Sequence, residues 1–315
     1  MTQTYLHLHP DARNWATEDG DSRIARIRDS AVWIANSYSD QAIEVFQDIM
    51  QQPPGRRMLN VLLTAESGMG KTAILDHFAR KYAHPFDQQS GVRRQPVVVA
   101  LMPPNPCEYE FLDQVMIAAG APLSPHRTSR ATTLREMAMR VLETIGTRVL
   151  VVDEINSVLG GTARQQRLFL QLLRFLSNSL RIGFICAGTP EARQALMSDP
   201  QLRSRFLEVD LPAWSPNSEL QQFLNRLVQT LPLREPSPID SPVLRRFIIE
   251  RSGGVTEHMC RAFRRAAVRA IQSGHECIDL ETLMTPDVWR GSGRPVAPVL
   301  LRRSPLRTVE TPSVQ

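Results

Sequence analysis

Ala65-Glu66-Ser67-Gly68-Met69-Gly70-Lys71-Thr72 is the stretch that decides the fold of this chain. The apolar run Val61-Leu62-Leu63 precedes it, and the following residues, 73–78, have their apolar side chains at helical spacing. A strand, a glycine-rich turn and a helix in this order are the context of a phosphate-binding P-loop. The backbone N–H groups of such a turn, together with the helix N-terminus, form a pocket for phosphate.

Each part of this stretch matches the chemistry of a nucleotide site. We expect the backbone of Glu66–Gly70 to wrap the phosphates and the Lys71 ammonium to reach the β- and γ-phosphates. The Thr72 hydroxyl is the expected ligand of Mg²⁺. Ala65 replaces the first glycine of the motif, at a position that mainly requires a small residue.

A second stretch follows about eighty residues later. Arg148-Val149-Leu150-Val151-Val152-Asp153-Glu154 is a continuous apolar run that ends in two carboxylates. Runs of this kind are typical of strands buried on both faces of a parallel sheet. Asp153 would lie at the carboxyl end of its strand, where open α/β sheets bind ligands. We therefore expect Asp153 to hold Mg²⁺ and Glu154 to polarise the attacking water.

Composition places the chain among ordinary globular proteins. Of its 315 residues, 42% are hydrophobic and 22% charged, and no apolar run approaches a membrane span. The four cysteines show neither a pairing pattern nor a metal-ligand spacing, and the N-terminus resembles no secretory signal, which predicts a cytoplasmic protein without membrane contact. The net charge of +5 is compatible with nucleic-acid binding but does not require it.

Strands and helices alternate along the middle of the chain, which predicts an α/β fold with a parallel sheet flanked by helices. Residues 1–22 are polar with little periodicity and are expected to form a mobile arm. The nucleotide-binding core, with its N-terminal helices, is assigned to residues 23–212, a small helical lid to 213–290, and a disordered, Pro- and Arg-rich tail to 291–315.

The segment before the P-loop has a helical period that runs from Ile24 to Tyr38. Asp40 is a candidate cap for a second helix, which Pro53-Pro54-Gly55 would end. These helices could pack beside a nucleotide base or merely cover an edge of the sheet, and the pattern favours neither.

Two further positions are candidates for the chemistry. Thr189 follows an apolar strand that neighbours the Asp153 strand, where a polar side chain could position the lytic water. Arg203 and Arg205 flank Ser204 before the apolar Phe206, and after a P-loop this pattern favours an arginine finger that reaches the γ-phosphate of a neighbouring subunit. The alternative is a solvated basic turn.

These elements, in their order, resemble the AAA+ ATPases, and more closely the TniB/TnsC family of transposition ATPases. The resemblance covers about residues 20–285. The stretches that carry it include Arg57-Met58-Leu59-Asn60, Met102-Pro103-Pro104, Asp153-Glu154-Ile155-Asn156, Leu173-Arg174-Phe175-Leu176 and Asp199-Pro200-Gln201-Leu202. Two positions depart from the pattern, because Thr256 stands where many AAA+ lids have a sensor-2 arginine and Asn156 stands where family members often have histidine.

The resemblance implies an AAA+ ATPase that binds ATP and Mg²⁺ between subunits of a homo-oligomer, a ring or a filament around double-stranded DNA. It implies that the oligomer marks target DNA and recruits a DDE transposase, that hydrolysis drives disassembly, and that a TniQ-type adaptor loads it. Thr189 would be sensor 1. Arg127, Thr128 and Arg130 lie in a region that resembles the channel-facing part of such assemblies and are the candidate DNA contacts; the alternative is an ordinary solvated loop.

Two other functions remain open. One is a nucleotide-gated scaffold that hardly hydrolyses ATP, which the intact Asp153-Glu154 pair disfavours. The other is an AAA+ loader of a replicative helicase, which the missing sensor-2 arginine and the Leu-Arg-Phe-Leu stretch disfavour. A turnover assay addresses the first alternative, and co-purification with a transposase or a helicase addresses the second.

Overall fold

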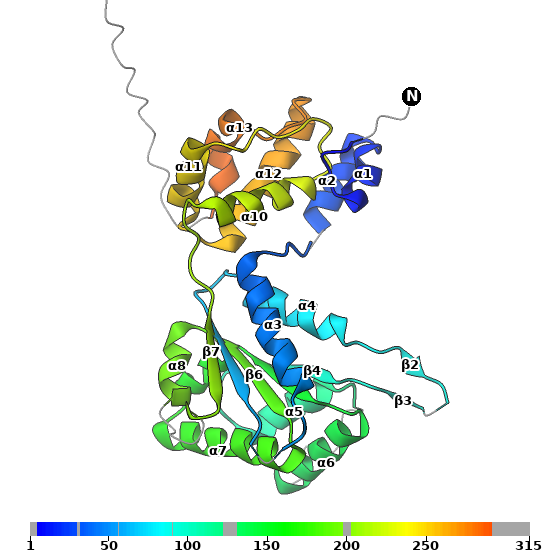
Figure 1. The fold of residues 1–315 in the computed structure, drawn as a ribbon, viewed down its shortest axis with the longest axis vertical. Coiled ribbons are helices and arrows are strands. Elements are labelled where there is room, and N and C mark those ends of the chain that lie inside the picture. Colours follow the sequence, from blue (N-terminus) through cyan, green and yellow to red (C-terminus); the bar gives the residue numbers. More distant parts are fainter. Residues whose placement is uncertain are drawn as a thin grey trace, which may run out of the picture.

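The computed structural model describes residues 5–29, 32–55, 57–89, 91–121, 131–197 and 203–291. Within them, a five-stranded parallel sheet with helices on both faces carries a separate helical unit above it (Figure 1). The predicted α/β core with a C-terminal helical lid is confirmed. Arg127, Thr128 and Arg130 lie outside the described residues, as do Asp199–Leu202 of the family pattern and most of the predicted tail.

The sheet has the order β4-β5-β6-β1-β7, and its paired strands are all parallel. Its strands are β1 (Asn60–Thr64), β4 (Val97–Leu101), β5 (Val149–Asp153), β6 (Gly183–Gly188) and β7 (Phe206–Asp210). Every residue of β1, β5 and β6 is buried, which explains their continuous apolar sequences. Because β6 lies between β1 and β5, the P-loop and Asp153 flank it at one edge of the sheet.

Alternate strand residues face two different cores. Val61 and Leu63 pack with α3 and α4, whereas Leu62 belongs to the core beneath α5, α6, α7 and α8. The helices on the first face are α3 (Ser37–Gln51) and α4 (Lys71–Lys81). Those on the second face are α5 (Glu108–Ala118), α6 (Ala131–Thr144), α7 (Ala163–Leu180) and α8 (Pro190–Met197). A short hairpin of β2 (Phe86–Asp87) and β3 (Val92–Arg93) follows α4, and the 3₁₀ helix η1 (Ile155–Gly160) follows β5.

The helical unit contains more than the predicted lid. Its C-terminal elements are α10 (Ser218–Gln229), α11 (Pro242–Ser252), α12 (Thr256–Ser273), α13 (Leu280–Met284) and the 3₁₀ helix η2 (Pro286–Trp289). Two N-terminal helices, α1 (Pro10–Ala16) and α2 (Gly20–Asp29), lie beside them (Figure 1). The expectation of a mobile arm over residues 1–22 is therefore wrong for residues 5–22, and the boundary placed at residue 23 falls inside α2.

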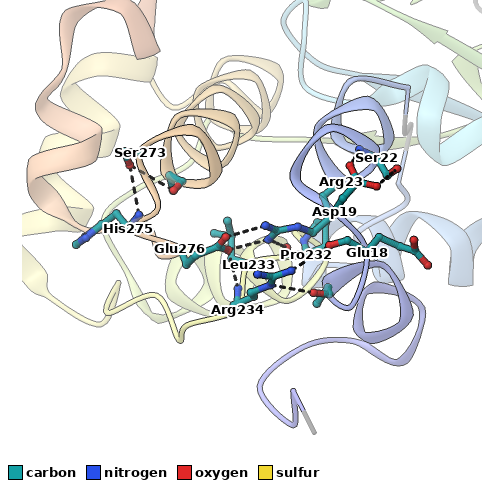
Figure 2. A network of polar contacts seen from close by, with 12 residues as sticks. Glu18, Asp19, Ser22, Arg23, Pro232, Leu233, Arg234, Ser273, His275 and Glu276 are labelled. Carbon is teal, nitrogen blue, oxygen red and sulfur yellow. Dashed lines mark hydrogen bonds and ion pairs between the residues drawn. The ribbon is translucent and has the colours of Figure 1, made fainter. Parts of the chain in front are cut away.

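Long-range polar contacts hold these N-terminal helices on the lid. The His9 N–H donates to the Gln229 carbonyl at 2.8 Å, and Tyr5, Leu8, Ala12 and Ala16 form a small buried cluster. The guanidinium of Arg23 donates two bonds of 2.7 Å to the Glu276 carboxylate and one of 3.1 Å to the Pro232 carbonyl (Figure 2). Arg23 is almost fully buried, because the carboxylate and carbonyl replace its water.

The helical period from Ile24 to Tyr38 is interrupted. α2 ends at Asp29, residues 32–36 are not helical, and α3 begins at Ser37. Asn36 is the N-cap: its side chain accepts from the Ser39 N–H at 3.0 Å, and the Ser39 hydroxyl accepts from the Asn36 N–H at 2.9 Å. The prediction that Asp40 caps this helix is therefore wrong. Residues 32–36 connect the helical unit to the sheet, and residues 211–217 lead back to it (Figure 1).

Candidate functional site

The P-loop joins the buried strand β1 to α4. Gly68 and Gly70 have φ angles of +77° and +95°, in the left-handed region that favours glycine. Gly70 is the N-cap residue, so α4 begins at Lys71 and the free N–H groups of its first turn point toward the loop. The backbone thus has the strand, turn and helix that the sequence predicts, a form suited to binding an anion.

Lys71 lies inside the loop and is buried. Its ammonium donates to the carbonyls of Ala65 at 2.7 Å and Glu66 at 3.0 Å. Burial lowers the pKa of Lys71, while the nearby carboxylates of Glu154, Asp153 and Glu66 oppose that shift. A desolvated ammonium beside the first turn of α4 can therefore bind a phosphate with little competition from water.

Thr72 and Asp153 come together although they are 81 residues apart. The Thr72 hydroxyl donates to Asp153 Oδ2 at 2.7 Å, and the Glu154 N–H donates to Oδ1 at 2.8 Å. Burial raises the pKa of Asp153, and these two bonds oppose the shift because they favour the carboxylate. A hydroxyl and a carboxylate in contact are oxygen donors of the kind that Mg²⁺ prefers, so the residues fit the ion that the motif implies.

Glu154 has a left-handed backbone, with φ of 57°, a conformation that residues other than glycine seldom adopt and that often marks functional sites. The Asn156 side-chain amide donates to Glu154 Oε2 at 3.2 Å, and Asn156 Oδ1 accepts from the Thr189 N–H at 3.4 Å. Asn156 thus links the two candidate residues. In the sequence, Asn156 stands out only as a departure from the family pattern, and its place two residues after Glu154 is the signal that could have identified it.

Thr189 is the single residue between β6 and α8. Its side chain hydrogen-bonds Glu191, which holds the pKa of that exposed carboxyl below its usual value. The structure therefore places Thr189 next to the Asp153-Glu154 strand end, with its hydroxyl directed to α8 and its amide to Asn156.

The lid contacts the P-loop directly. The Glu257 N–H, in the first turn of α12, donates to the Gly68 carbonyl at 2.9 Å. Thr256 does not contact the loop through its hydroxyl, which accepts from the Trp214 indole N–H at 2.9 Å. Arg261, one turn further along, pairs with the Glu257 carboxylate. Glu257 was not predicted, because in the sequence only its place after the Gly253-Gly254 turn distinguishes it.

Arg203 and Arg205 lie away from this pocket. The Asn60 N–H donates to the Arg205 carbonyl at 2.8 Å, so Arg205 lies at the end of β1 opposite the P-loop, about 16 Å away for five residues in a strand. Arg205 donates to Asn178 Oδ1 at 2.8 Å and lines an open hollow of about 410 Å³ with Arg57 and Arg181. Within one chain, the two arginines are not brought to Lys71.

The segment before α3 approaches the P-loop helix. The Trp33 ring stacks on His77 of α4, with 4.2 Å between the ring centroids. Trp33 also lines a cavity of about 900 Å³ bounded by α1, α2 and α10. α3 itself packs on the face of the sheet. α3 therefore covers the sheet, and residues 32–35 line this cavity. A nucleotide base beside them stays a prediction.

Three comparisons relate this geometry to known proteins. The chain matches the family model described as "Bacterial TniB protein" over residues 23–216. A curated protein, Chaperone protein ClpB 1 of Synechocystis, is 26% identical over 170 residues, which cover 53% of this chain but only 17% of that protein. The chain therefore spans less than a fifth of this relative.

Solved structures show the same fold. The Aeropyrum pernix ORC2 protein, described in ADPNP–ADP complexes, matches with a TM-score of 0.58 and 17% identity, covering 82% of this chain and 70% of that one. The Aeropyrum pernix ORC1 protein in complex with DNA matches with the same score and identity, covering 83% and 67%. Among the residues that the structure describes, no helix is both long and apolar enough to cross a membrane. The sheet order and these neighbours are those of an AAA+ ATPase fold, and with a family match over more than half of its length the chain belongs to the bacterial TniB family.

Proposed function

We propose that the protein is an AAA+ ATPase that binds ATP with Mg²⁺, assembles on double-stranded DNA, and recruits a DDE transposase as a regulator of transposition. The observation that carries the nucleotide part is the assembly of buried Lys71 with the Thr72–Asp153 contact at the end of the sheet. Membership of the TniB family and the net charge of +5 support the DNA part.

In this proposal, the chain binds the triphosphate between the first turn of α4 and Lys71. Thr72 and Asp153 would hold Mg²⁺, which would supply positive charge to the phosphates. Glu154 accepts a proton from a water molecule while the oxygen of that water forms a bond to the γ-phosphorus. The bond between the γ-phosphorus and the oxygen that bridges it to the β-phosphate breaks, and ADP leaves. Asn156 orients Glu154 through its 3.2 Å bond and connects it to Thr189.

Completion of the site requires a second copy of the chain. Arg205, with Arg203 as the alternative, lies too far from Lys71 to reach a phosphate in its own subunit, about 16 Å along β1. On the surface of another subunit it would face the γ-phosphate and stabilise the charge that develops during transfer. The nucleotide then joins the subunits, and hydrolysis loosens the oligomer.

Lysine provides a sharp test of the nucleotide site, because the chain has only Lys71 and Lys81. Lys71→Ala should abolish binding of a fluorescent ATP analogue and turnover, whereas Lys81→Ala, at the exposed end of the same helix, should leave both unchanged. Equal ATP affinity in the two variants would remove the P-loop assignment. ATP turnover measured with and without duplex DNA separates this function from a scaffold that hardly hydrolyses ATP.

The DNA contacts need a separate test because Arg127, Thr128 and Arg130 are outside the described residues. If their side chains bind phosphates, replacing Arg127 and Arg130 with alanine should weaken duplex binding and reduce its salt dependence by about two phosphate contacts. An unchanged slope of affinity against salt would exclude these contacts. Co-purification with a DDE transposase and a TniQ-type adaptor tests the partners.

A further inference from the structure

The outward face of α12 carries a row of arginines. Arg261, Arg265 and Arg269 are four residues apart, and Arg264 lies beside them. The opposite face of the helix is buried in the lid; its residues are Met259, Ala262, Phe263, Ala266, Ala267, Ala270 and Ile271. Like charges at this spacing destabilise a helix by roughly 0.2–0.5 kcal/mol per pair. The row therefore does not stabilise α12 itself.

This row lines a groove of about 530 Å³ between α12, α2 and η2. Its floor is apolar and consists of Ile27, Cys260, Val268 and Val288. Burial raises the pKa of Cys260 to about 11, so this thiol is neutral and belongs to the apolar floor. With Arg28 on the α2 side, five arginines and only two carboxylates line the groove, which leaves an excess of three positive charges.

The two carboxylates are already engaged. Glu257 pairs with Arg261, and Asp287 pairs with Arg290 at 3.0 Å. Among the described residues, the groove arginines without a carboxylate in ion-pair distance are Arg28, Arg264, Arg265 and Arg269, of which Arg265 donates to the Arg290 carbonyl. The groove therefore has the charge and the apolar floor to bind an acidic, partly apolar element.

α3 carries the complementary row. Asp40, Glu44 and Asp48 are exposed, four residues apart, and α3 contains no lysine or arginine. None of the three forms an ion pair within the described part of the chain. The buried side of α3 packs toward the sheet, so Glu44 and Asp48 face outward, while Asp40 in the first turn also lines the cavity of about 900 Å³. This row also consists of like charges at a spacing that costs roughly 0.2–0.5 kcal/mol per pair.

We propose that the acidic row of α3 in one copy of the chain lies along the α12 groove of another copy. The three carboxylates oppose the excess positive charge of the groove, and both rows, Asp40–Asp48 and Arg261–Arg269, extend about 12 Å. Among the described residues no ion pair joins the two rows within one chain, so the contact is assigned to two copies. This inference rests on the oligomer of the proposed function.

The contact joins two different surfaces, so it is heterologous and repeats from copy to copy as a ring or a filament. Other occupants fit the groove less well. The chain's own residues 292–315 contain four arginines and one glutamate and would be repelled. A DNA backbone also offers negative charge, but the proposed DNA contacts lie elsewhere, in the stretch that contains Arg127 and Arg130.

Charge exchange tests the contact in the full chain. One variant combines Arg265→Glu with Arg269→Glu, and the other combines Glu44→Arg with Asp48→Arg. Arg246→Glu and Glu136→Arg, both exposed and away from the rows, serve as controls. Thermal unfolding verifies that each variant folds, and mass photometry measures assembly with an ATP analogue, Mg²⁺ and duplex DNA.

Each exchange alone should weaken self-association at least 10-fold. An equimolar mixture of the two variants should restore it, and so should a single chain that carries both exchanges. If neither restores assembly, or if the controls weaken it equally, the contact is wrong. Should the unmodified chain stay monomeric, the oligomer of the proposed function fails; should it assemble with no effect of either exchange, only this interface fails.

Discussion

The contact between the lid and the P-loop, made by Glu257 and Gly68, can be tested with two glycines of similar backbone conformation. Gly68 has φ of +77°, and a Cβ there would lie 2.9 Å from Val255 Cγ1 and 3.1 Å from Glu257 Oε2. Gly253 has φ of +67°, and a Cβ there would meet nothing within 4 Å. Alanine therefore introduces the same backbone strain at both positions, but only at Gly68 does it press against the lid.

The expected magnitudes follow from these contacts. A left-handed alanine costs roughly 1–2 kcal/mol, so Gly253→Ala should lower the free energy of unfolding by that amount. Gly68→Ala must in addition displace Val255 and disturb the 2.9 Å bond from the Glu257 N–H to the Gly68 carbonyl, a bond worth about 1 kcal/mol. We therefore expect a loss of roughly 2–3 kcal/mol for Gly68→Ala.

Urea unfolding measures both losses, and titration with a fluorescent ATP analogue measures affinity. If the lid closes on the nucleotide through the Glu257–Gly68 contact, Gly68→Ala should weaken ATP binding about 10-fold, equivalent to about 1.4 kcal/mol. Gly253→Ala should change the affinity less than about 2-fold, or roughly 0.4 kcal/mol. Equal loss of stability and affinity in the two variants would refute the reasoning, because the α12–P-loop contact would then carry no energy in solution.

Three further predictions concern other parts of the molecule. Glu154→Gln should retain ATP and trap assembled protein on DNA, so normal turnover would exclude Glu154 as the base. Glu276→Gln should lower stability by about 3 kcal/mol, because it leaves buried Arg23 without a counter-charge, whereas Asp76→Asn at an exposed pair should cost under about 0.5 kcal/mol. Burial raises the pKa of Glu276, but the bonds from Arg23 outweigh it and hold that pKa below its usual value. The stability that this pair provides is therefore present near neutral pH and is lost as acid protonates the carboxyl. Glu276→Gln should abolish this loss when unfolding is measured against pH. Cys186 is fully buried and its pKa is raised to about 12, so a thiol reagent should label it only after unfolding.

The central part of the fold could be predicted because its signals are local. Continuous apolar runs identify β1 and β5, and the order of motifs places Thr72 near Asp153. α1, and the packing of α2 on the lid, were missed because their stabilising contacts are distant in sequence. Arg23 is charged, yet it is buried by Glu276, 253 residues away. No local pattern indicates such a pair.

The interruption of the helical period has a similar cause. A continuous helix from Ile24 to Tyr38 satisfies local spacing, but α2 packs on the lid and α3 on the sheet, so the chain must bend between them. The Asn36–Ser39 capping box then begins α3, a signal that the apolar spacing obscures. The candidate site shows the same limit, since Glu257 approaches Gly68 only through the packing of the lid.

The route of the chain also determines how the lid can move. Residues 32–36 and residues 211–217 are two separate covalent connections between the lid and the sheet (Figure 1). Two connections restrict the rotation of the lid more than one would, because the lid cannot rotate about one connection without moving the other. Opening and closing over the P-loop should therefore favour rotation about the line that joins the two connections, and α1 and α2, which pack on the lid, should move with it.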